Sequence, residues 1–210
     1  DPSSVTKRPP QPIDQPAQAQ VPRLAEPEVQ APEVSVPRPH ERLLARPGND
    51  LLGGLAAVYK SLASNVAGPG PEKASSFQAV REPSISVYAY LQRMRTYAQC
   101  SDACFIASLA YIDRIVLRRP GFEVSNLTIH RLLVASVVVG AKFWDDTYYT
   151  NAYYAKVCGL SLRELNSLEA EMLKMIDFRV AISPDEFDRY SYIILGKLME
   201  APGNEAARAA

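Results

Sequence analysis

Residues that could carry out covalent or metal chemistry are scattered through this sequence rather than gathered into a motif. The two histidines, His40 and His130, lie far apart, and neither has a convincing Ser or Cys partner for nucleophilic catalysis. Cys100 and Cys104 are one helical turn apart, but no second pair of ligands follows, so the spacing does not indicate zinc. Gly53-Gly54 lacks the lysine of a phosphate-binding loop. The sequence therefore predicts no enzyme, no metal site and no cofactor.

Two carboxylates fall on helix faces that should be apolar. In the helix expected from Ser161 to Phe178, Glu169 projects into the apolar stripe. Asp113 faces the core side of an earlier helix in the same way. An unpaired buried carboxylate is costly, so each should have a partner, and we expect Asp113 to pair with Arg93 or with Arg95. The alternative is that each carboxylate is a solvated residue at the edge of its helix face.

These side chains must be positioned by helices, and the segment 126–146 is the one around which the others are expected to pack. It is apolar on nearly every side, as a central helix is. It is too long for a buried strand and too short for a membrane span. One narrow edge of this helix has small apolar side chains in the middle and a charged side chain at each end, and we interpret it as a surface for another chain. This edge consists of Arg131, Ala135, Val138 and Lys142.

The chain divides into a tail, a helical domain and a second tail. Residues 1–49 hold 11 of the 17 prolines and bury little, so we predict that they are disordered. A PxxP match at Pro9–Pro12 is expected by chance in such a composition. From 50 to 196, amphipathic patterns with helix start signals recur seven times, without any alternating strand pattern, and predict an all-α domain. Residues 197–210 are expected to be flexible.

The composition narrows the function classes. Lys plus Arg and Asp plus Glu both total 23, so net charge favours neither nucleic acid nor membrane as a partner. The three cysteines form no even disulfide framework, and the sequence shows no secretory signal and no transmembrane segment. We therefore expect a protein of the cytoplasm, the nucleus or both.

Three motifs resemble those of a cyclin box. They are residues 109–114 (LAYIDR), 139–143 (VGAKF) and 173–178 (LKMIDF), which resemble parts of its second, third and fifth helices in the same order and spacing. More narrowly, residues 150–157 and 165–169 are similar to the P/U-type (Pho80-like) cyclins. The resemblance covers about residues 50–196. It implies a single five-helix cyclin box with an additional flanking helix on each side.

The resemblance also implies a function: binding and activating a cyclin-dependent Ser/Thr protein kinase as a heterodimer, in cell-cycle control or nutrient (phosphate) signalling. In cyclins a Lys at the end of the third helix and a Glu on the fifth hold main-chain groups of the kinase, and these positions fall on Lys142 and Glu169. In P/U-type members an Asp after the third helix engages a kinase arginine. Asp146 matches it best, with Asp145 as the alternative. The family Asp of the second helix corresponds to Asp113, as a structural ion-pair residue.

The alternative function is a cyclin-fold adaptor that binds a non-kinase protein or nucleic acid, as some general transcription factors of this fold bind DNA. Residues 82–195 carry 12 Lys plus Arg and 13 Asp plus Glu, a net charge of −1. A duplex-binding protein should instead present a basic face. The sequence therefore favours the kinase regulator.

Overall fold

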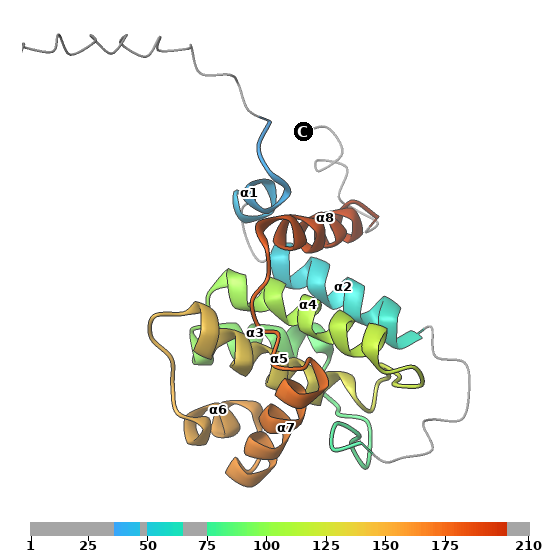
Figure 1. The fold of residues 1–210 in the computed structure, drawn as a ribbon, viewed down its shortest axis with the longest axis vertical. Helices are drawn as coiled ribbons and strands as arrows, with labels where there is room; N and C mark the ends of the chain where they lie inside the picture. Colours follow the sequence, from blue (N-terminus) through green and yellow to red (C-terminus); the bar gives the residue numbers. More distant parts are fainter. Residues whose placement is uncertain (1–35, 47–49, 65–74, 201–210) are drawn as a thin grey trace, which may run out of the picture. The chain divides into compact units, whose positions relative to one another are not determined.

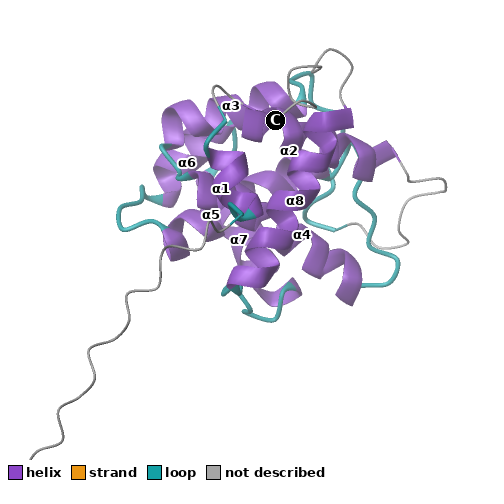
Figure 2. Cartoon of the chain, turned by 90° about the horizontal axis from the view of Figure 1, so that it is seen from above, coloured by secondary structure: helices purple, strands orange, loops and turns teal. Residues whose placement is uncertain are grey.

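The computed structural model describes residues 36–46, 50–64 and 75–200, and every regular element within them is an α-helix (Figures 1 and 2). In chain order the helices are α1 (Pro39–Leu44), α2 (Asp50–Ser64), α3 (Val87–Ala98), α4 (Asp102–Arg118), α5 (Ile129–Trp144), α6 (Asn151–Cys158), α7 (Leu162–Met175) and α8 (Pro184–Glu200). The predicted all-α class is confirmed, with α3 to α7 as the five box helices between α2 and α8. The PxxP match and most of both predicted tails lie outside the described residues.

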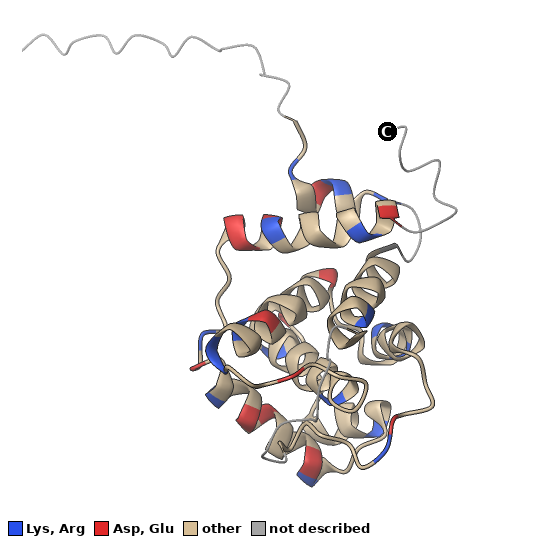
Figure 3. Ribbon diagram, turned by 90° about the vertical axis from the view of Figure 1, so that its right-hand side faces the viewer, with Lys and Arg blue, Asp and Glu red and all other residues tan. Residues whose placement is uncertain are grey.

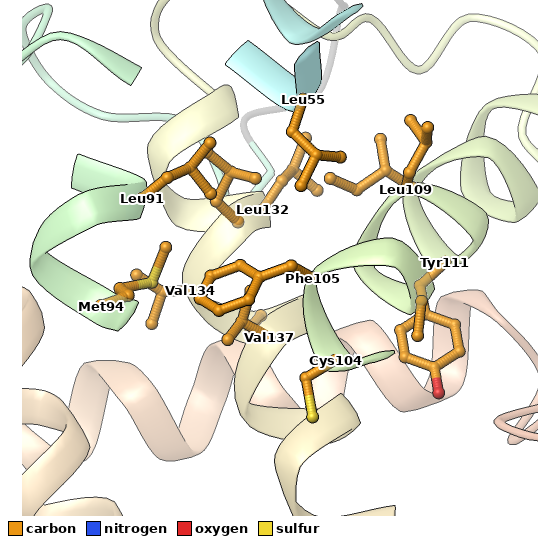
Figure 4. Close-up of a cluster of buried hydrophobic side chains, with 14 of the residues drawn as sticks. Leu55, Leu91, Met94, Cys104, Phe105, Leu109, Tyr111, Leu132, Val134 and Val137 are labelled. Carbon is orange, nitrogen blue, oxygen red and sulfur yellow. The ribbon is translucent and has the colours of Figure 1, made fainter. Parts of the chain in front are cut away.

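Helix α5 is the centre of the core, as the sequence predicts. Every residue from Leu132 to Ala141 is buried. Helix α5 packs against both α4 and α7, and it also contacts α3. Figure 4 shows Leu132, Val134 and Val137 of this helix among apolar side chains from α2, α3 and α4. A helix with apolar residues on all sides is stable only when neighbours cover it, which explains this central position.

Two glycines permit close helix crossings. A Cβ atom at Gly140 of α5 would lie 3.3 Å from the carbonyl oxygen of Cys104 in α4. A Cβ atom at Gly54 of α2 would lie 2.6 Å from Cγ2 of Ile194 in α8. A helical glycine costs about 1 kcal/mol relative to alanine, so glycine there needs a reason. The reason is packing, which accounts for Gly54 in an otherwise well-formed helix.

Helix α1 lies where the sequence predicts a disordered tail, so that prediction is wrong for residues 36–46. Leu43 is 2% exposed, and α1 packs against α8 (Figure 1). Asp188 of α8 bonds Arg38 at 3.4 Å and His40 at 2.6 Å. Pro39 stands in the first turn of α1, where proline favours helix initiation because the missing N–H is not needed there. Proline content alone therefore misjudges this short segment.

Two helix ends also differ from the prediction. Helix α7 stops at Met175 instead of reaching Phe178, because Asp177 and Phe178 adopt left-handed backbone conformations with φ of 58° and 55°. Helix α8 continues through Gly196 to Glu200, so residues 197–200 are helical rather than part of a tail. A glycine ends a helix only when it takes a positive φ, which Gly196 does not.

Candidate functional site

Lys142 and Glu169, the two charged residues singled out by the sequence, lie beside each other. Lys142 is in the last turn of α5 and Glu169 is in the middle of α7, and the packing of these helices brings the side chains together. The Nζ atom of Lys142 is 2.5 Å from Oε1 of Glu169. The Lys142 and Glu169 side chains are 31% and 15% exposed, respectively, so the pair is partly buried with one side open to solvent. Glu169 thus has the partner that a largely buried carboxylate requires.

Asn151, the first residue of α6, completes this cluster. Its Nδ2 donates to Oε2 of Glu169 at 2.6 Å and to Oδ1 of Asn166 at 2.8 Å. Thr150 caps α6 and accepts a bond from the Tyr153 N–H, which fixes where the helix begins. Both oxygens of Glu169 are therefore held. Sequence reasoning missed Asn151. A capping residue shows where a helix starts, but it does not show which residue the side chain of the next position, here Asn151, will contact.

The two aspartates after α5 have different surroundings. Asp145 Oδ2 accepts hydrogen bonds from the N–H of Ser101 at 3.1 Å and from the thiol of Cys104 at 3.2 Å. It therefore anchors the end of α5 to the N-terminus of α4, where an anion is favoured by the helix dipole. Asp146 is exposed and has no hydrogen bond or ion pair to any described residue. Of the two candidates, Asp146 is the one available to a partner.

Two exposed phenylalanines follow the helices that carry Lys142 and Glu169, and sequence reasoning missed them. Phe143, next to Lys142, is 47% exposed, and Phe178, in the turn after α7, is 66% exposed. The end of α5 is tied to this turn, because Trp144 Nε1 donates to the Tyr111 hydroxyl at 3.0 Å, which donates to the Val180 carbonyl at 2.8 Å. The available signal was that each phenylalanine ends a motif that resembles the cyclin box. Phe143 therefore lies beside Lys142, and the turn that carries Phe178 is connected to the end of α5.

The middle of the predicted small-residue edge of α5 is not a surface. Ala135 and Val138 are 0% and 1% exposed, so no other chain can reach them, and their assignment to a partner interface is wrong. Arg131 is held within the chain: it donates to the Ser76 carbonyl at 2.8 Å and to Glu164 Oε1 at 2.7 Å. A helical projection identifies a face with small residues, but it cannot show whether that face packs against a neighbouring helix of the same chain or binds a partner protein.

Asp113 also has a different partner from the one predicted. Its Oδ2 accepts a hydrogen bond from the Tyr190 hydroxyl of α8 at 2.8 Å, and Arg189 donates to the same hydroxyl at 3.0 Å. Burial, reinforced by the Asp113 carboxylate, raises the pKa of Tyr190 to about 12. The predicted Asp113–Arg93 ion pair is absent, and Arg95 instead pairs with Asp102 at 2.9 Å. Asp113 therefore holds α4 to α8 through a tyrosine hydroxyl rather than through an arginine.

The described part of the chain presents no assembled metal site. It contains no group of three or more His, Cys, Asp or Glu side chains placed to hold an ion. The cysteines Cys100, Cys104 and Cys158 are buried free thiols. Burial raises the pKa of the Cys100 thiol to about 12 and that of Cys158 to about 11, so both stay protonated and weakly nucleophilic. No described helix combines the length and apolar character needed to cross a membrane.

The arrangement of the box helices agrees with a comparison against known families. The family model for cyclins matches residues 55–180. This chain belongs to the cyclin family. That match includes Lys142, Glu169 and both aspartates after α5, so the described cluster lies inside the domain that defines cyclins. Cyclins are regulatory rather than catalytic subunits.

Similar proteins place this cyclin in the predicted subgroup. It is 42% identical to Cyclin-U4-1 of Arabidopsis thaliana over 123 residues, which cover 58% of this chain and 61% of that protein. It is 43% identical to Cyclin-U1-1 of the same plant over 138 residues, covering 66% and 65% respectively. Identity to Cyclin-P4-1 of Oryza sativa is 40% over 124 residues, covering 59% and 58%. The resemblance to P/U-type cyclins is confirmed, and the chain spans about three-fifths of these relatives' length.

Proposed function

We propose that this cyclin is the regulatory subunit that binds and activates a cyclin-dependent Ser/Thr protein kinase. The kinase would cover what we call the docking face, which consists of Lys142, Phe143, Asp146, Glu169 and Phe178. The process would be cell-cycle control or nutrient (phosphate) signalling, in the cytoplasm, the nucleus or both. The observation that supports the proposal most directly is the Lys142–Glu169 pair, which lies at the positions that cyclins use to hold a kinase.

The ion pair has unused hydrogen-bonding capacity for a partner's main chain. A lysine ammonium carries three donors, and Lys142 uses one of them on Glu169. A carboxylate accepts about four hydrogen bonds, and Glu169 receives one on each oxygen. A peptide carbonyl can therefore bind Lys142, and a peptide N–H can bind Glu169, without separating the pair. Unpaired main-chain groups of this kind occur at helix ends, so a mobile helix of the partner suits the site.

The other members of the docking face add affinity and orientation. Partly exposed aromatic rings such as Phe143 and Phe178 become strong contributors once a partner covers them. Phe178 is held in a left-handed conformation that costs a phenylalanine about 1–2 kcal/mol, yet its ring remains largely exposed in the free chain. Asp146 offers both carboxylate oxygens to a guanidinium group, the geometry of a bidentate Arg–carboxylate pair. A kinase arginine is the expected ligand.

The charge distribution supports a protein partner rather than nucleic acid. In Figure 3 the Lys and Arg residues are interspersed with Asp and Glu residues along the helices. Several arginines are also neutralised within the chain, including Arg114 by Glu186 and Arg131 by Glu164. Within the described residues this leaves no basic stripe of the kind that binds a phosphate backbone.

Affinity capture followed by titration tests the proposal. The parent chain is used to capture partners from its own cell extract, the captured kinase is identified by mass spectrometry, and its affinity is measured for Lys142→Ala and Glu169→Ala. The matched control is Lys197→Ala, which removes an ion pair of the same 2.5 Å length on α8. We expect both site variants to lose affinity by at least 30-fold and the control to bind as the parent does. Equal binding by all of them would refute the docking face.

A further inference from the structure

The segment between α5 and α6 carries a tyrosine, Tyr148, that the fold does not use. It lies between Asp146, which belongs to the docking face, and Asn151, which bonds Glu169 of that face, and it is 58% exposed. Its hydroxyl makes no hydrogen bond, and its ring no aromatic contact, with any described residue. The neighbouring tyrosines differ: Tyr149 donates to Gln99 at 2.9 Å, and its ring stacks on Tyr153 at a centroid distance of 4.3 Å.

Tyr148 differs from the other tyrosines of the chain in its exposure, its backbone and its lack of bonds. All 11 tyrosines lie in the described part of the chain. Five are buried: Tyr59, Tyr90, Tyr111, Tyr154 and Tyr190. Four exposed ones are in helices, where main-chain hydrogen bonds prevent the extended form that a protein kinase accepts: Tyr88, Tyr97, Tyr153 and Tyr192. Of the two between helices, Tyr149 is held by its hydrogen bond and ring stack. Tyr148 alone is exposed, outside a helix and unbonded.

We infer that Tyr148 is a phosphorylation site for a tyrosine-directed protein kinase, and that its phosphate closes the docking face to the partner kinase. The second part rests on the proposed function. The exposed Asp146, two residues before Tyr148, supplies an acidic neighbour that a basic substrate groove can recognise. Asp145 does not contribute in the same way, because its carboxylate is bonded to the N-terminus of α4.

The chemical step is an ordinary phosphoryl transfer with ATP as the donor. The phenolic oxygen of Tyr148 forms a bond to the γ-phosphorus of ATP, and the bond from that phosphorus to the β–γ bridging oxygen breaks. ADP leaves, and the phenolic proton passes to the carboxylate base of the modifying kinase. The reaction oxidises and reduces nothing, so it needs no further reactant.

The phosphate would oppose docking through charge. It adds about −1.5 to −2 charges at pH 7, close to Asp146. The cation of the docking face, Lys142, is already paired with Glu169 at 2.5 Å, so it leaves little positive charge to receive the phosphate. Covering an unpaired dianion with another protein removes it from water at a large cost. We therefore expect the phosphorylated chain to bind the partner kinase at least tenfold more weakly. The free fold should be unaffected, because the Tyr148 hydroxyl holds nothing.

The first experiment locates the modification. The full chain is incubated with ATP and the catalytic domain of a tyrosine kinase that prefers acidic substrates, and phosphopeptides are assigned by mass spectrometry. Tyr148→Phe is compared with Tyr97→Phe, which removes the hydroxyl of an equally exposed tyrosine in a helix. We expect one phosphate per chain in the parent and in Tyr97→Phe, and almost none in Tyr148→Phe. Equal or faster modification of other tyrosines would overturn the inference.

The second experiment measures the consequence. Affinity for the captured kinase is compared between the phosphorylated parent, the unphosphorylated parent and Lys142→Ala, with a thermal melt of each. A tenfold or greater loss on phosphorylation, without a change in melting temperature, supports the inference. If phosphorylation leaves affinity unchanged while Lys142→Ala weakens it, the inference fails and the proposed function stands. If Lys142→Ala binds as the parent does, the docking face itself fails, and the closure of that face with it.

Discussion

Replacing Glu169 with leucine separates recognition from folding, because the two effects on the free chain nearly cancel. The substitution removes hydrogen bonds from Lys142 at 2.5 Å and from Asn151 at 2.6 Å. Such charged bonds are worth about 1.5–3 kcal/mol each when fully buried. Lys142 is 31% exposed and can be rehydrated, and Asn151 keeps its bond to Asn166, so we expect a loss of only about 1–2 kcal/mol in total. A leucine buried at this position contributes about 1.5–2.5 kcal/mol in return.

The melting temperature of Glu169→Leu should therefore stay within a few degrees of the parent value. Kinase binding should fall much further, because a buried charged group lost from an interface costs about 2–5 kcal/mol, roughly 30- to 4,000-fold in affinity. Circular dichroism melts and titration calorimetry against the captured kinase measure both quantities. Glu169→Gln is the matched control, since it keeps the size and one acceptor while losing the charge, and we expect intermediate binding. A stability loss above about 3 kcal/mol in Glu169→Leu would show that Glu169 is an internal structural residue. Unchanged binding would show that the kinase does not use it.

Three further substitutions test contacts elsewhere in the fold. Asp145→Ala should lower the free energy of unfolding by about 1–2 kcal/mol, because the N-terminus of α4 loses its anchor, whereas Asp146→Ala should leave the melt unchanged and weaken only kinase titrations. Gly54→Ala should lower the melting temperature, since the new Cβ atom would lie 2.6 Å from Cγ2 of Ile194 in α8. Gly196→Ala, where a Cβ atom has nothing within 4 Å, should leave the melting temperature unchanged or raise it. A similar effect of both substitutions would contradict the packing argument. The pKa of Glu186 is lowered, first by the backbone N–H of Ser183 and also by Arg114, so its stabilisation is present at neutral pH and is lost as pH falls through the lowered value. Melts of Glu186→Gln and the parent should therefore differ at pH 7 and converge in acid, below the ordinary pKa range of a glutamate. A gap that persists in acid would refute this.

Much of the fold could be predicted from the sequence, because the start of a helix and its apolar face depend on residues close together in the chain. Ser161 and Ser183 each accept a hydrogen bond from the N–H of the glutamate three residues later, as in a capping box, which is recognisable from the sequence alone. The central position of α5 follows from its composition alone. Helix α1 was missed because the average over a proline-rich segment conceals one leucine that packs on α8 and one histidine that pairs with it.

The candidate site could be predicted only in part, because its geometry depends on contacts between residues that are far apart in the chain. The partner of Asp113 is a tyrosine 77 residues later, and no helical projection could rank it above a nearby arginine. Ala135 and Val138 look the same on a wheel whether they face a neighbouring helix or another protein. The two adjacent aspartates are distinguished by the positions of Ser101 and Cys104, which lie more than 40 residues earlier.

The internal pairing of Lys142 with Glu169 has a consequence for the kinetics of assembly. Because these two charges cancel, Asp146 is the remaining ion of the docking face without a counterion among the described residues. A partner approaching through water meets a weak long-range field, so association should proceed without steering, at about 10⁵–10⁶ M⁻¹s⁻¹ and with little dependence on salt. Differences in affinity would then arise in the dissociation rate. Changes that keep the net charge of the docking face would alter how long each complex lasts, not how often the two proteins meet.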